Sequence, residues 1–515
     1  MSGKLIHRLL NNGAKRLGTA APAASTDINP VMPPLDYTPP KYEGLSKDEC
    51  KKIRAAHVAP AVHRQTFHKE QPLFVAGKGQ YLFDENGVRY LDLMGGICTV
   101  SAGHAHDAVN AAITDQMSRV SHTSNIFLHN KIHEYSKAMI DKMPKDSNLS
   151  VVYFCNSGSE ANDLAMLMAR AYTGYLNIVG LRRAYHGASA TNIALTAMPL
   201  YRHASMPITN VSQTMSPDPY RGLWGGSHCR DGSPCQTLRS CDCAPDVCDG
   251  AEMYAQQYRD HLLTLCPGGK GLAGFIGEGM GGMTAAMMQS KGFYKKAYEI
   301  TKSFGGVNIM DEVQTGFGRL GTHYWGFEYH GVRPDIITAA KSIGNGFPLA
   351  MAVTTPEIAE AFANSSLHFN TFGGNAVASA AGLATLKAID DDGLMENSRI
   401  VGNRFLEGFN YLREKYDHVG DCRGKGLMMA MEFVESKSTN NPMPTYKMNA
   451  ILERTKDLGI LLGKGGLYAN CFRIQPPMCV SLEDADFTIL VMDKVFAEYQ
   501  EGKIDVEAFN PNPAK

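Results

Sequence analysis

The chain has 515 residues, of which 44% are hydrophobic, and its 50 basic and 51 acidic side chains give a net charge of −1. This length predicts about two to four domains, and the balanced charge argues against nucleic acid or an acidic membrane as a partner. No apolar run approaches the roughly twenty residues that a membrane-spanning helix needs. We therefore expect partners that are small molecules.

The N-terminal segment, residues 1–26, contains no Asp or Glu. Lys4, Arg8, Lys15 and Arg16 are interleaved with apolar residues at helix-compatible spacing. A basic amphipathic helix without acids is typical of a mitochondrial transit segment, which predicts a protein of the mitochondrial matrix. A disordered tail is the alternative interpretation.

Two further segments precede the main body of the chain. Residues 27–45 are rich in proline and predict a linker or an arm that lies on another surface. Residues 46–104 are expected to begin a smaller domain, and they contain alternating apolar residues on both sides of Asn86-Gly87. Because Asn-Gly is the favoured pair of a two-residue hairpin turn, this pattern predicts a β-hairpin.

From residue 105 to about 385, short apolar runs alternate with helical stretches, which predicts a large α/β domain with a mostly parallel sheet. The predicted strands are Val151–Cys155, Asn177–Gly180, Ala273–Gly277, Val307–Met310 and Ile336–Ala339. Helices are expected after residue 158 and over 376–390, followed by another that ends near residue 415. Residues 386–501 predict the remainder of the smaller α+β domain, and 502–515 form a tail.

The predicted large domain is interrupted by residues 216–249, which are rich in Gly, Pro, Cys and Asp. Several of the 12 cysteines gather there, among them Cys229, Cys241, Cys243 and Cys248. Their spacing is not the paired Cys-x-x-Cys of a zinc ribbon, so we predict free thiols and no metal site. A zinc site remains the alternative. The other cysteines are scattered, as in proteins of reducing compartments.

Two strand ends carry the most informative pair of side chains. The strand Val307–Met310 runs into Asp311, and the strand Ile336–Ala339 is followed by Lys341 and a glycine-rich turn. A lysine amine can form a Schiff base with the aldehyde of pyridoxal phosphate, and a carboxylate can keep the pyridine nitrogen protonated. The pair therefore predicts a pyridoxal-phosphate enzyme with Lys341 and Asp311 as its catalytic residues.

Other strand ends supply candidate cofactor contacts. Ser157-Gly158-Ser159 opens a helix, where backbone N–H groups and the helix dipole favour a phosphate, although such residues also serve as ordinary helix caps. Tyr185, next to His186, could stack on the cofactor ring or be a packed core tyrosine. Gln314 could donate to the ring hydroxyl or be a satisfied polar residue of its loop.

The stretches Asp311–Arg319, Pro334–Ile336 and Lys341–Pro348 resemble the signature of class III pyridoxal-phosphate aminotransferases. The resemblance covers about residues 60 to 498. Within that class, the cysteine-rich stretch from Arg221 to Asp231 is similar to the mitochondrial alanine–glyoxylate aminotransferases of the second type. Membership implies fold type I, with a mostly parallel seven-stranded sheet in the large domain and a smaller α+β domain built from both chain ends.

The resemblance also implies roles for individual residues. The implied cofactor contacts are Ser157, Gly158, Ser159, Tyr185, His186, Asp311, Gln314, Lys341 and Thr371. Thr371 matches a threonine that reaches the cofactor phosphate of the neighbouring subunit, so a homodimer or homotetramer with shared active sites is expected.

The substrate side is implied to involve Arg423, as the clamp of the substrate carboxylate, and Glu278 near it. After Glu278 the chain reads Gly279-Met280-Gly281-Gly282, where relatives usually have Pro-Ile-Gln-Gly. The missing proline and glutamine predict a looser loop at this place.

The implied reaction is a ping-pong transamination through the Schiff base on Lys341. The amino group of L-alanine or a related amino acid is transferred to glyoxylate, with pyruvate and glycine as products. Two alternatives remain open: a class III phospho-lyase that acts on a phosphorylated amine, and an aminotransferase of the ornithine or 4-aminobutyrate type. All of them bind an amino acid or another small amine, and the aminotransferases also bind a 2-oxo acid.

Overall fold

The computed structural model describes residues 29–511, apart from 64–66, 203–209 and 225–248. The predicted transit segment 1–26 and the cysteines from Cys229 to Cys248 lie outside the described residues.

The larger part of the molecule is built on a seven-stranded sheet with strand order β4-β10-β9-β8-β7-β5-β6. Its strands are β4 (Val151–Cys155), β5 (Asn177–Leu181), β6 (Val211–Thr214), β7 (Leu272–Glu278), β8 (Val307–Asp311), β9 (Ile336–Ala339) and β10 (Ala350–Thr354). Strand β10 is antiparallel to both of its neighbours, and the pairs from β9 to β6 are parallel. The predicted strands and the mostly parallel sheet are confirmed, whereas β6 and β10 were not predicted.

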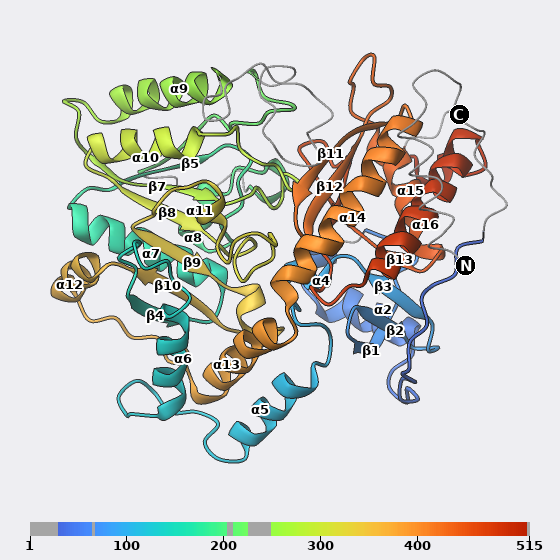
Figure 1. The fold of residues 1–515 in the computed structure, drawn as a ribbon, viewed down its shortest axis with the longest axis horizontal. Coiled ribbons are helices and arrows are strands. Elements are labelled where there is room, and N and C mark those ends of the chain that lie inside the picture. Colours follow the sequence, from blue (N-terminus) through green and yellow to red (C-terminus); the bar gives the residue numbers. More distant parts are fainter. Residues whose placement is uncertain (1–28, 64–66, 203–209, 225–248, 512–515) are drawn as a thin grey trace.

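Helices cover the sheet and connect it to the smaller domain, as Figure 1 shows. The α-helices are α2 (Lys47–His57), α3 (Pro60–His63), α4 (Gly95–Cys98), α5 (Asp107–Met117), α6 (Asn130–Ile140), α7 (Gly158–Thr173), α8 (Ala190–Leu195), α9 (Asp249–Leu265), α10 (Phe293–Ser303), α11 (Gly326–Tyr329), α12 (Pro356–Ser365), α13 (Ala376–Asp391), α14 (Leu394–Lys415), α15 (Thr445–Asp457) and α16 (Leu482–Gln500). The described residues also form the short 3₁₀ helices η1 (Pro199–Tyr201), η2 (Lys341–Gly344) and η3 (Glu507–Phe509).

The core of the large domain has two layers because successive strand side chains point to opposite faces of the sheet. Phe275 of β7 and Met310 of β8 pack in the same cluster as the apolar face of α10. Their chain neighbours Ile276 and Ile309 pack in the other cluster, with the buried alanines, leucine and methionines of α7. Strands buried on both faces explain why these segments are continuous apolar runs in the sequence.

The smaller domain contains two four-stranded sheets, seen on the right of Figure 1. One comprises β1 (Phe74–Lys78), β2 (Tyr81–Asp84), β3 (Arg89–Asp92) and β13 (Ile460–Leu461), and the other β11 (Val419–Lys425), β12 (Met428–Phe433), β15 (Cys471–Ile474) and β14 (Gly463–Gly465). Strands β2 and β3 form the predicted hairpin. Parallel pairing of β13 with β3 joins segments from the two ends of the chain in one sheet.

The proline-rich segment lies against the smaller domain. The guanidinium of Arg89 donates to the carbonyl oxygen of Pro33 at 2.6 Å, and the rings of Tyr37 and Phe83 lie 5.3 Å apart. These contacts favour the arm over the linker interpretation of residues 27–45.

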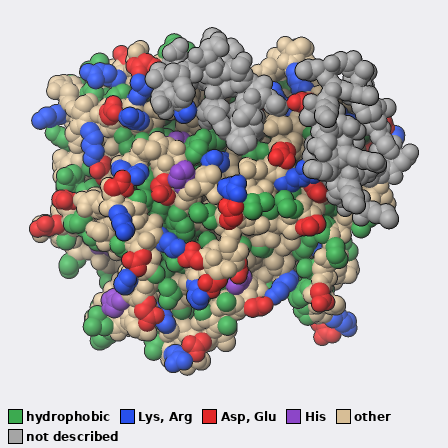
Figure 2. Space-filling view, viewed as in Figure 1, with side chains coloured by type: hydrophobic (Ala, Val, Ile, Leu, Met, Phe, Trp, Pro, Cys, Tyr) green, Lys and Arg blue, Asp and Glu red, His purple; other side chains and the backbone are tan. Residues whose placement is uncertain are grey.

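On the face of the molecule in Figure 2, basic and acidic side chains are interspersed among apolar ones, without a large area of a single sign. Within the described part of the chain, no helix is both long and apolar enough to cross a membrane. The same residues contain no group of three or more His, Cys, Asp or Glu side chains arranged to hold a metal ion. The alternative of a zinc site falls on cysteines that are not described.

Candidate active site

The predicted site residues converge at the carboxyl ends of the parallel strands, which is where open α/β sheets place their ligands. A cavity of about 160 Å³ at this edge is lined by Gly158, Ser159, Asn162, Tyr185, His186, Gly187, Glu278, Asp311, Val313, Gln314 and Lys341. Ser157 is next to this wall as the residue that caps α7. Thr371 and Arg423 do not line the cavity.

The carboxylate of Asp311, at the end of β8, is held by three donors. Its Oδ2 accepts hydrogen bonds from Asn162 Nδ2 and His186 Nδ1, each at 2.8 Å, and its Oδ1 accepts one from the Val313 amide at 3.0 Å. Asn162 is oriented in turn by the Thr338 hydroxyl, which donates to its Oδ1 at 2.6 Å. The plane of the carboxylate is therefore fixed from several directions.

His186 is buried beside this carboxylate, and burial opposes its protonation. The hydrogen bond with Asp311 and the negative charge of Asp311 outweigh burial, so the pKa of His186 is raised. Sequence reasoning placed His186 near the cofactor but missed Asn162. The signal for Asn162 is a polar side chain on the otherwise apolar inner face of α7.

Lys341 follows β9 and begins η2 with a φ of +53°, in the left-handed region that side chains other than glycine rarely occupy. Backbone strain of this kind gathers at functional positions. Burial lowers the pKa of the Lys341 amine, against the opposing influence of Cys98 and Asp311. Among the described residues, Lys341 has no ion-pair partner. A depressed pKa increases the fraction of neutral, nucleophilic amine at neutral pH.

The start of α7 forms another wall of the cavity. The side chain of Ser157 accepts a hydrogen bond from the Glu160 amide at 3.2 Å. The amides of Gly158 and Ser159 have no acceptor inside the helix, because they belong to its first turn. A side chain at position 158 would lie 3.2 Å from both methyl groups of Val313, so glycine keeps this helix end open. Unpaired amides and the helix dipole together form an anion site.

Tyr185 and Glu278, which also line the cavity, are joined by a hydrogen bond. The amide of Tyr185 donates to Glu278 Oε1 at 3.0 Å, and the amide of Gly282 donates to Oε2 at 2.8 Å. Burial raises the pKa of Glu278 in spite of the neighbouring His186. The Tyr185 ring lies edge-on to Tyr201 with 5.2 Å between the ring centres.

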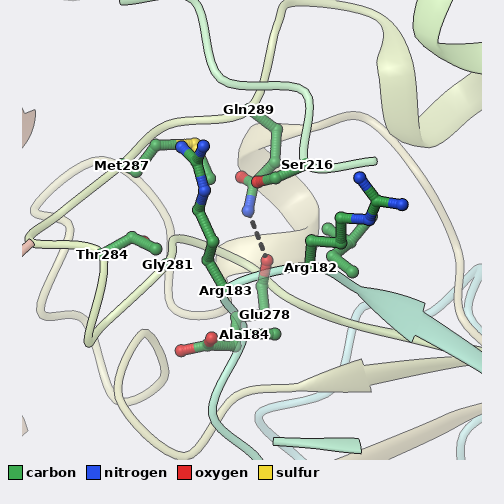
Figure 3. Close-up of a pocket in the computed structure, with 10 residues that line it drawn as sticks. Arg182, Arg183, Ala184, Ser216, Glu278, Gly281, Thr284, Met287 and Gln289 are labelled. Carbon is green, nitrogen blue, oxygen red and sulfur yellow. Dashed lines mark hydrogen bonds between the residues drawn. The ribbon is translucent and has the colours of Figure 1, made fainter. Parts of the chain in front are cut away.

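The loop after Glu278 is not loose, contrary to the expectation from its glycines. The side chains of Gln289, at 3.1 Å, and Tyr294 donate to the carbonyl oxygen of Glu278, and His330 donates to that of Gly279 at 2.6 Å. Figure 3 shows the bond between Gln289 and Glu278. Hydrogen bonds from these three side chains therefore hold the backbone at Glu278, where β7 ends, and at Gly279, where relatives usually have proline.

Arg473 of β15 is a site residue that sequence reasoning missed. Its Nη2 donates to Gln314 Oε1 at 3.2 Å and to Gln475 Oε1 at 3.0 Å, and its Nη1 lies 3.3 Å from the sulfur of Met283. The side chain is buried without a carboxylate partner in the described part of the chain, and burial lowers the pKa of Arg473. The available signal is an arginine between apolar neighbours on a fully buried strand.

Arg423 is placed elsewhere, which corrects its expected position as a carboxylate clamp. Its Nη1 donates to Glu432 at 2.8 Å and to Asp421 at 3.1 Å. Its Nε and Nη2 donate to the carbonyl oxygens of Ala285 at 2.9 Å and Thr284 at 3.2 Å. Because two buried carboxylates and two carbonyls already engage the guanidinium, it is not available to a ligand in the cavity.

Thr371 lies in an exposed loop before α13 and does not line the cavity. The loop also exposes Leu367, Phe369 and Phe372, at 99%, 57% and 60% of their surfaces. A second exposed apolar group is Ile126–Leu128, and the rings of His122 and Phe372 lie 5.3 Å apart. The expected role of Thr371 toward a neighbouring subunit stays a prediction.

Comparison with known proteins identifies the class. A family model described as aminotransferase class-III matches residues 66–496, and the chain belongs to this family. It is 44% identical, over 96% of its length and 95% of the other chain, to the human protein named alanine–glyoxylate aminotransferase 2, mitochondrial.

Two solved structures are similar over nearly the whole described fold. A phospholyase from Arthrobacter in complex with phosphoethanolamine is 28% identical with a TM-score of 0.76, covering 87% of this chain and 99% of that one. An amine transaminase from an uncultivated Pseudomonas species, in its pyridoxal-phosphate-bound form, is 27% identical with a TM-score of 0.75, covering 86% and 97%.

The protein is therefore a fold-type-I aminotransferase with pyridoxal phosphate as its cofactor. The residues present fit that group. A buried carboxylate, an unpaired amine of lowered pKa and a helix end kept open by glycine surround one cavity.

Proposed function

We propose that this protein transfers the amino group of L-alanine, or of a related amino acid, to glyoxylate in the mitochondrial matrix. The name of the human relative supports both the reaction and the compartment. The acid-free residues 1–26 agree with the compartment. The observation that carries the proposal is the convergence of Lys341, Asp311 and the unpaired Arg473 on one cavity and its border.

The cofactor would be held from several sides. The amides and hydroxyls of Ser157, Gly158 and Ser159 would bind its phosphate, the Tyr185 ring would stack on its ring, and Gln314 would donate to its hydroxyl. Asp311, oriented by Asn162 and His186, would accept a hydrogen bond from the protonated pyridine nitrogen and so keep it protonated. Bound pyridoxal phosphate supplies an aldehyde that exchanges amino groups and a ring that withdraws electrons.

Lys341 has two tasks in this proposal. Its amine would hold the cofactor between turnovers, and when an amino acid is bound the freed amine would move a proton between the substrate Cα and the cofactor C4′. A base must be neutral to take that proton, and the lowered pKa of Lys341 favours the neutral amine. The same residues serve both half-reactions, so the kinetics are ping-pong.

We assign the substrate carboxylate to Arg473 rather than to Arg423. A guanidinium pairs with a carboxylate through two parallel hydrogen bonds, and burial strengthens them. Arg473 is 2% exposed and, within the described part of the chain, its side-chain hydrogen bonds go to neutral side chains, whereas Arg423 is engaged by Glu432 and Asp421. Glu278 would border the same substrate-side wall.

The active unit would be a homodimer or a larger homo-oligomer with shared sites. The apolar side chains at Ile126–Leu128 and at Leu367, Phe369 and Phe372 are strongly exposed, and exposed apolar groups of this kind mark interaction sites. Burying them against a second copy would bring Thr371 to the cofactor phosphate of that copy.

A half-reaction tests the function. Holoenzyme mixed with L-alanine alone should form about one pyruvate per subunit and then stop, because the amino group stays on the enzyme. Added glyoxylate should then be converted to the same amount of glycine. Continuous pyruvate formation without glyoxylate, or none at all, would contradict the proposal.

The similarity to the Arthrobacter phospholyase favours elimination of phosphate from a phosphorylated amine as a second candidate. That reaction needs no 2-oxo acid. Phosphate release from phosphoethanolamine, together with no response to L-alanine, would move the assignment to a lyase.

A further inference from the structure

A second cavity, of about 220 Å³, lies beside the active site where the chain leaves β6. It is lined by Arg182, Arg183, Met215, Ser216, Arg221, Gly222, Leu223 and Tyr254. Three of these residues are arginines, and none is an aspartate or glutamate. A concave wall with guanidinium groups and no carboxylate attracts anions.

Neighbouring acids compensate these charges only in part. Arg183 Nη1 lies 3.3 Å from Asp218 Oδ2, and Arg221 Nε donates to Glu432 Oε1 at 2.6 Å. Glu432 is shared with Arg423, which also pairs with Asp421, so these two arginines are matched by two carboxylates. Arg182 is exposed and forms no ion pair with any residue that the structure describes. The cavity therefore keeps a positive charge.

Two buried polar groups at this cavity have no hydrogen-bond partner among the residues that the structure describes. Ser216 is 8% exposed and its Oγ forms no hydrogen bond, and the Nη2 of Arg221 is buried without an acceptor. Its Nη1 is occupied by the carbonyl oxygen of Asn440 at 2.6 Å. Buried donors without acceptors are rare in folded proteins, and they commonly mark a place where a ligand or water binds.

We propose that this cavity binds an oxyanionic group, either a carboxylate or a phosphate, through Arg182, Arg183, Arg221 and the hydroxyl of Ser216. A guanidinium offers parallel N–H donors that match two oxygens of such a group, and a hydroxyl can donate to another. Both unpartnered donors would then be satisfied.

The anion site adjoins the active site. Arg182, Arg183 and Ser216 also line the narrow cavity of Figure 3, and Glu278 is another of its lining residues. In that view Ser216 lies between the side chains of Arg182 and Arg183. Tyr185, two residues after Arg183, already lines the cofactor cavity, and three residues of chain span at most roughly 10 Å.

This proximity allows two sources for the anion. One is the distal carboxylate of an amino acid bound in the active site, and this source rests on the proposed transamination. The other is a free anion such as inorganic phosphate, which does not depend on the reaction.

Direct binding tests the site itself. Inorganic phosphate is titrated calorimetrically into holoenzyme in phosphate-free buffer, so that the cofactor already occupies its own phosphate position. We expect saturable binding that Arg182→Gln weakens about tenfold or more, because one charge-assisted contact is lost. Ser216→Ala, which removes only a hydroxyl, should weaken it in the same direction. Arg259→Gln, an exposed arginine of α9 outside the cavity, is the matched control.

Kinetics distinguish the sources. L-Glutamate and its neutral isostere L-glutamine are compared as amino donors through the ratio of their kcat/KM values. A fall of this ratio in Arg182→Gln and Ser216→Ala, but not in Arg259→Gln, identifies a substrate carboxylate. Loss of phosphate binding with an unchanged ratio identifies a free anion. If neither phosphate binding nor the ratio differs from the control, the proposal is overturned. If the protein has no transaminase activity, the phosphate titration alone still tests the anion site.

Discussion

At the scale of single residues, orientation and desolvation define this site more than the identity of the catalytic groups. Asp311 and Lys341 are common side chains whose properties depend on Asn162, His186 and burial. Arg473 follows the same logic, because a buried guanidinium next to neutral amides lacks a counter-charge that a substrate carboxylate can supply.

Arg473→Gln should raise the KM for amino acid donors about tenfold to hundredfold, since a charge-assisted pair is worth roughly 1.5–3 kcal/mol. Cofactor content should stay unchanged, because the residue does not line the cofactor cavity. Steady-state kinetics and the cofactor absorbance check both statements. An unchanged KM in Arg473→Gln would show that Arg473 does not bind the substrate.

Gly282 permits the position of Gln314. A Cβ at residue 282 would lie 2.1 Å from Gln314 Nε2, so Gly282→Ala should displace that flexible side chain from Arg473. We expect a several-fold rise in KM, of the order of one lost hydrogen bond. In a Gln314→Ala background the same substitution should have little further effect. Additive effects of the two substitutions would show that Gly282 acts in another way.

At the scale of elements, strand ends could be predicted from the sequence, while contacts between distant strands could not. The pair Asp311 and Lys341 follows from local pattern, because parallel strands bring their carboxyl ends to one edge. Arg473 was missed because its contact with Gln314 spans 159 positions. Arg423 was misplaced because its burial against Glu432 depends on the pairing of β11 with β12.

The hairpin at Asn86-Gly87 and helix α7 were predicted because their signals are local. Strand β10 was not predicted. An apolar run also does not reveal whether a strand is parallel or antiparallel to its neighbours. The reversal of β10 between β4 and β9 is a property of the whole sheet.

The ion network of β11 and β12 ties the smaller domain to the loop after Glu278. Arg423 and Arg221 share Glu432, and Arg423 also holds the carbonyl oxygens of Thr284 and Ala285. Glu432→Gln should lower the free energy of unfolding by roughly 3–5 kcal/mol, because it leaves buried guanidinium groups without their charge partner.

Thermal or denaturant unfolding measures this change. The exposed pair Arg399–Glu396 is the control, and Glu396→Gln should change stability by less than about 1 kcal/mol. Equal effects of the two substitutions would contradict the structural role of the network.

At the scale of the whole molecule, buried histidines make stability depend on pH. His418 is 7% exposed among aromatic rings, and burial lowers its pKa to about 4. An unfolded chain protonates histidine near 6.5, so the stability that neutral His418 contributes is lost as pH falls from about 6.5 through 4.

This contribution amounts to roughly 2 kcal/mol between pH 7 and pH 5. The difference in thermal midpoint between these two pH values should therefore shrink in His418→Gln. It should stay unchanged in His57→Gln, which alters an exposed histidine. An undiminished difference in His418→Gln would mean that other groups determine the acid sensitivity.

The proposed sharing of active sites between subunits makes a prediction about assembly. Lys341→Ala and Thr371→Ala should each be inactive or impaired, yet their mixture should recover activity. A hybrid dimer contains one site with both residues intact, so random exchange restores about a quarter of the sites. Sedimentation should show that Phe372→Glu, in the exposed apolar loop, dissociates the oligomer. No recovery on mixing would contradict a site shared between subunits.

The central claim is that Lys341 moves the proton of the substrate Cα. Its most direct test follows the loss of deuterium from L-alanine labelled at Cα, by NMR, in ordinary water with holoenzyme and no glyoxylate. The wild type should release the label to solvent, and Lys341→Ala should not, although it keeps its fold. Release from Lys341→Ala at the wild-type rate would contradict the account.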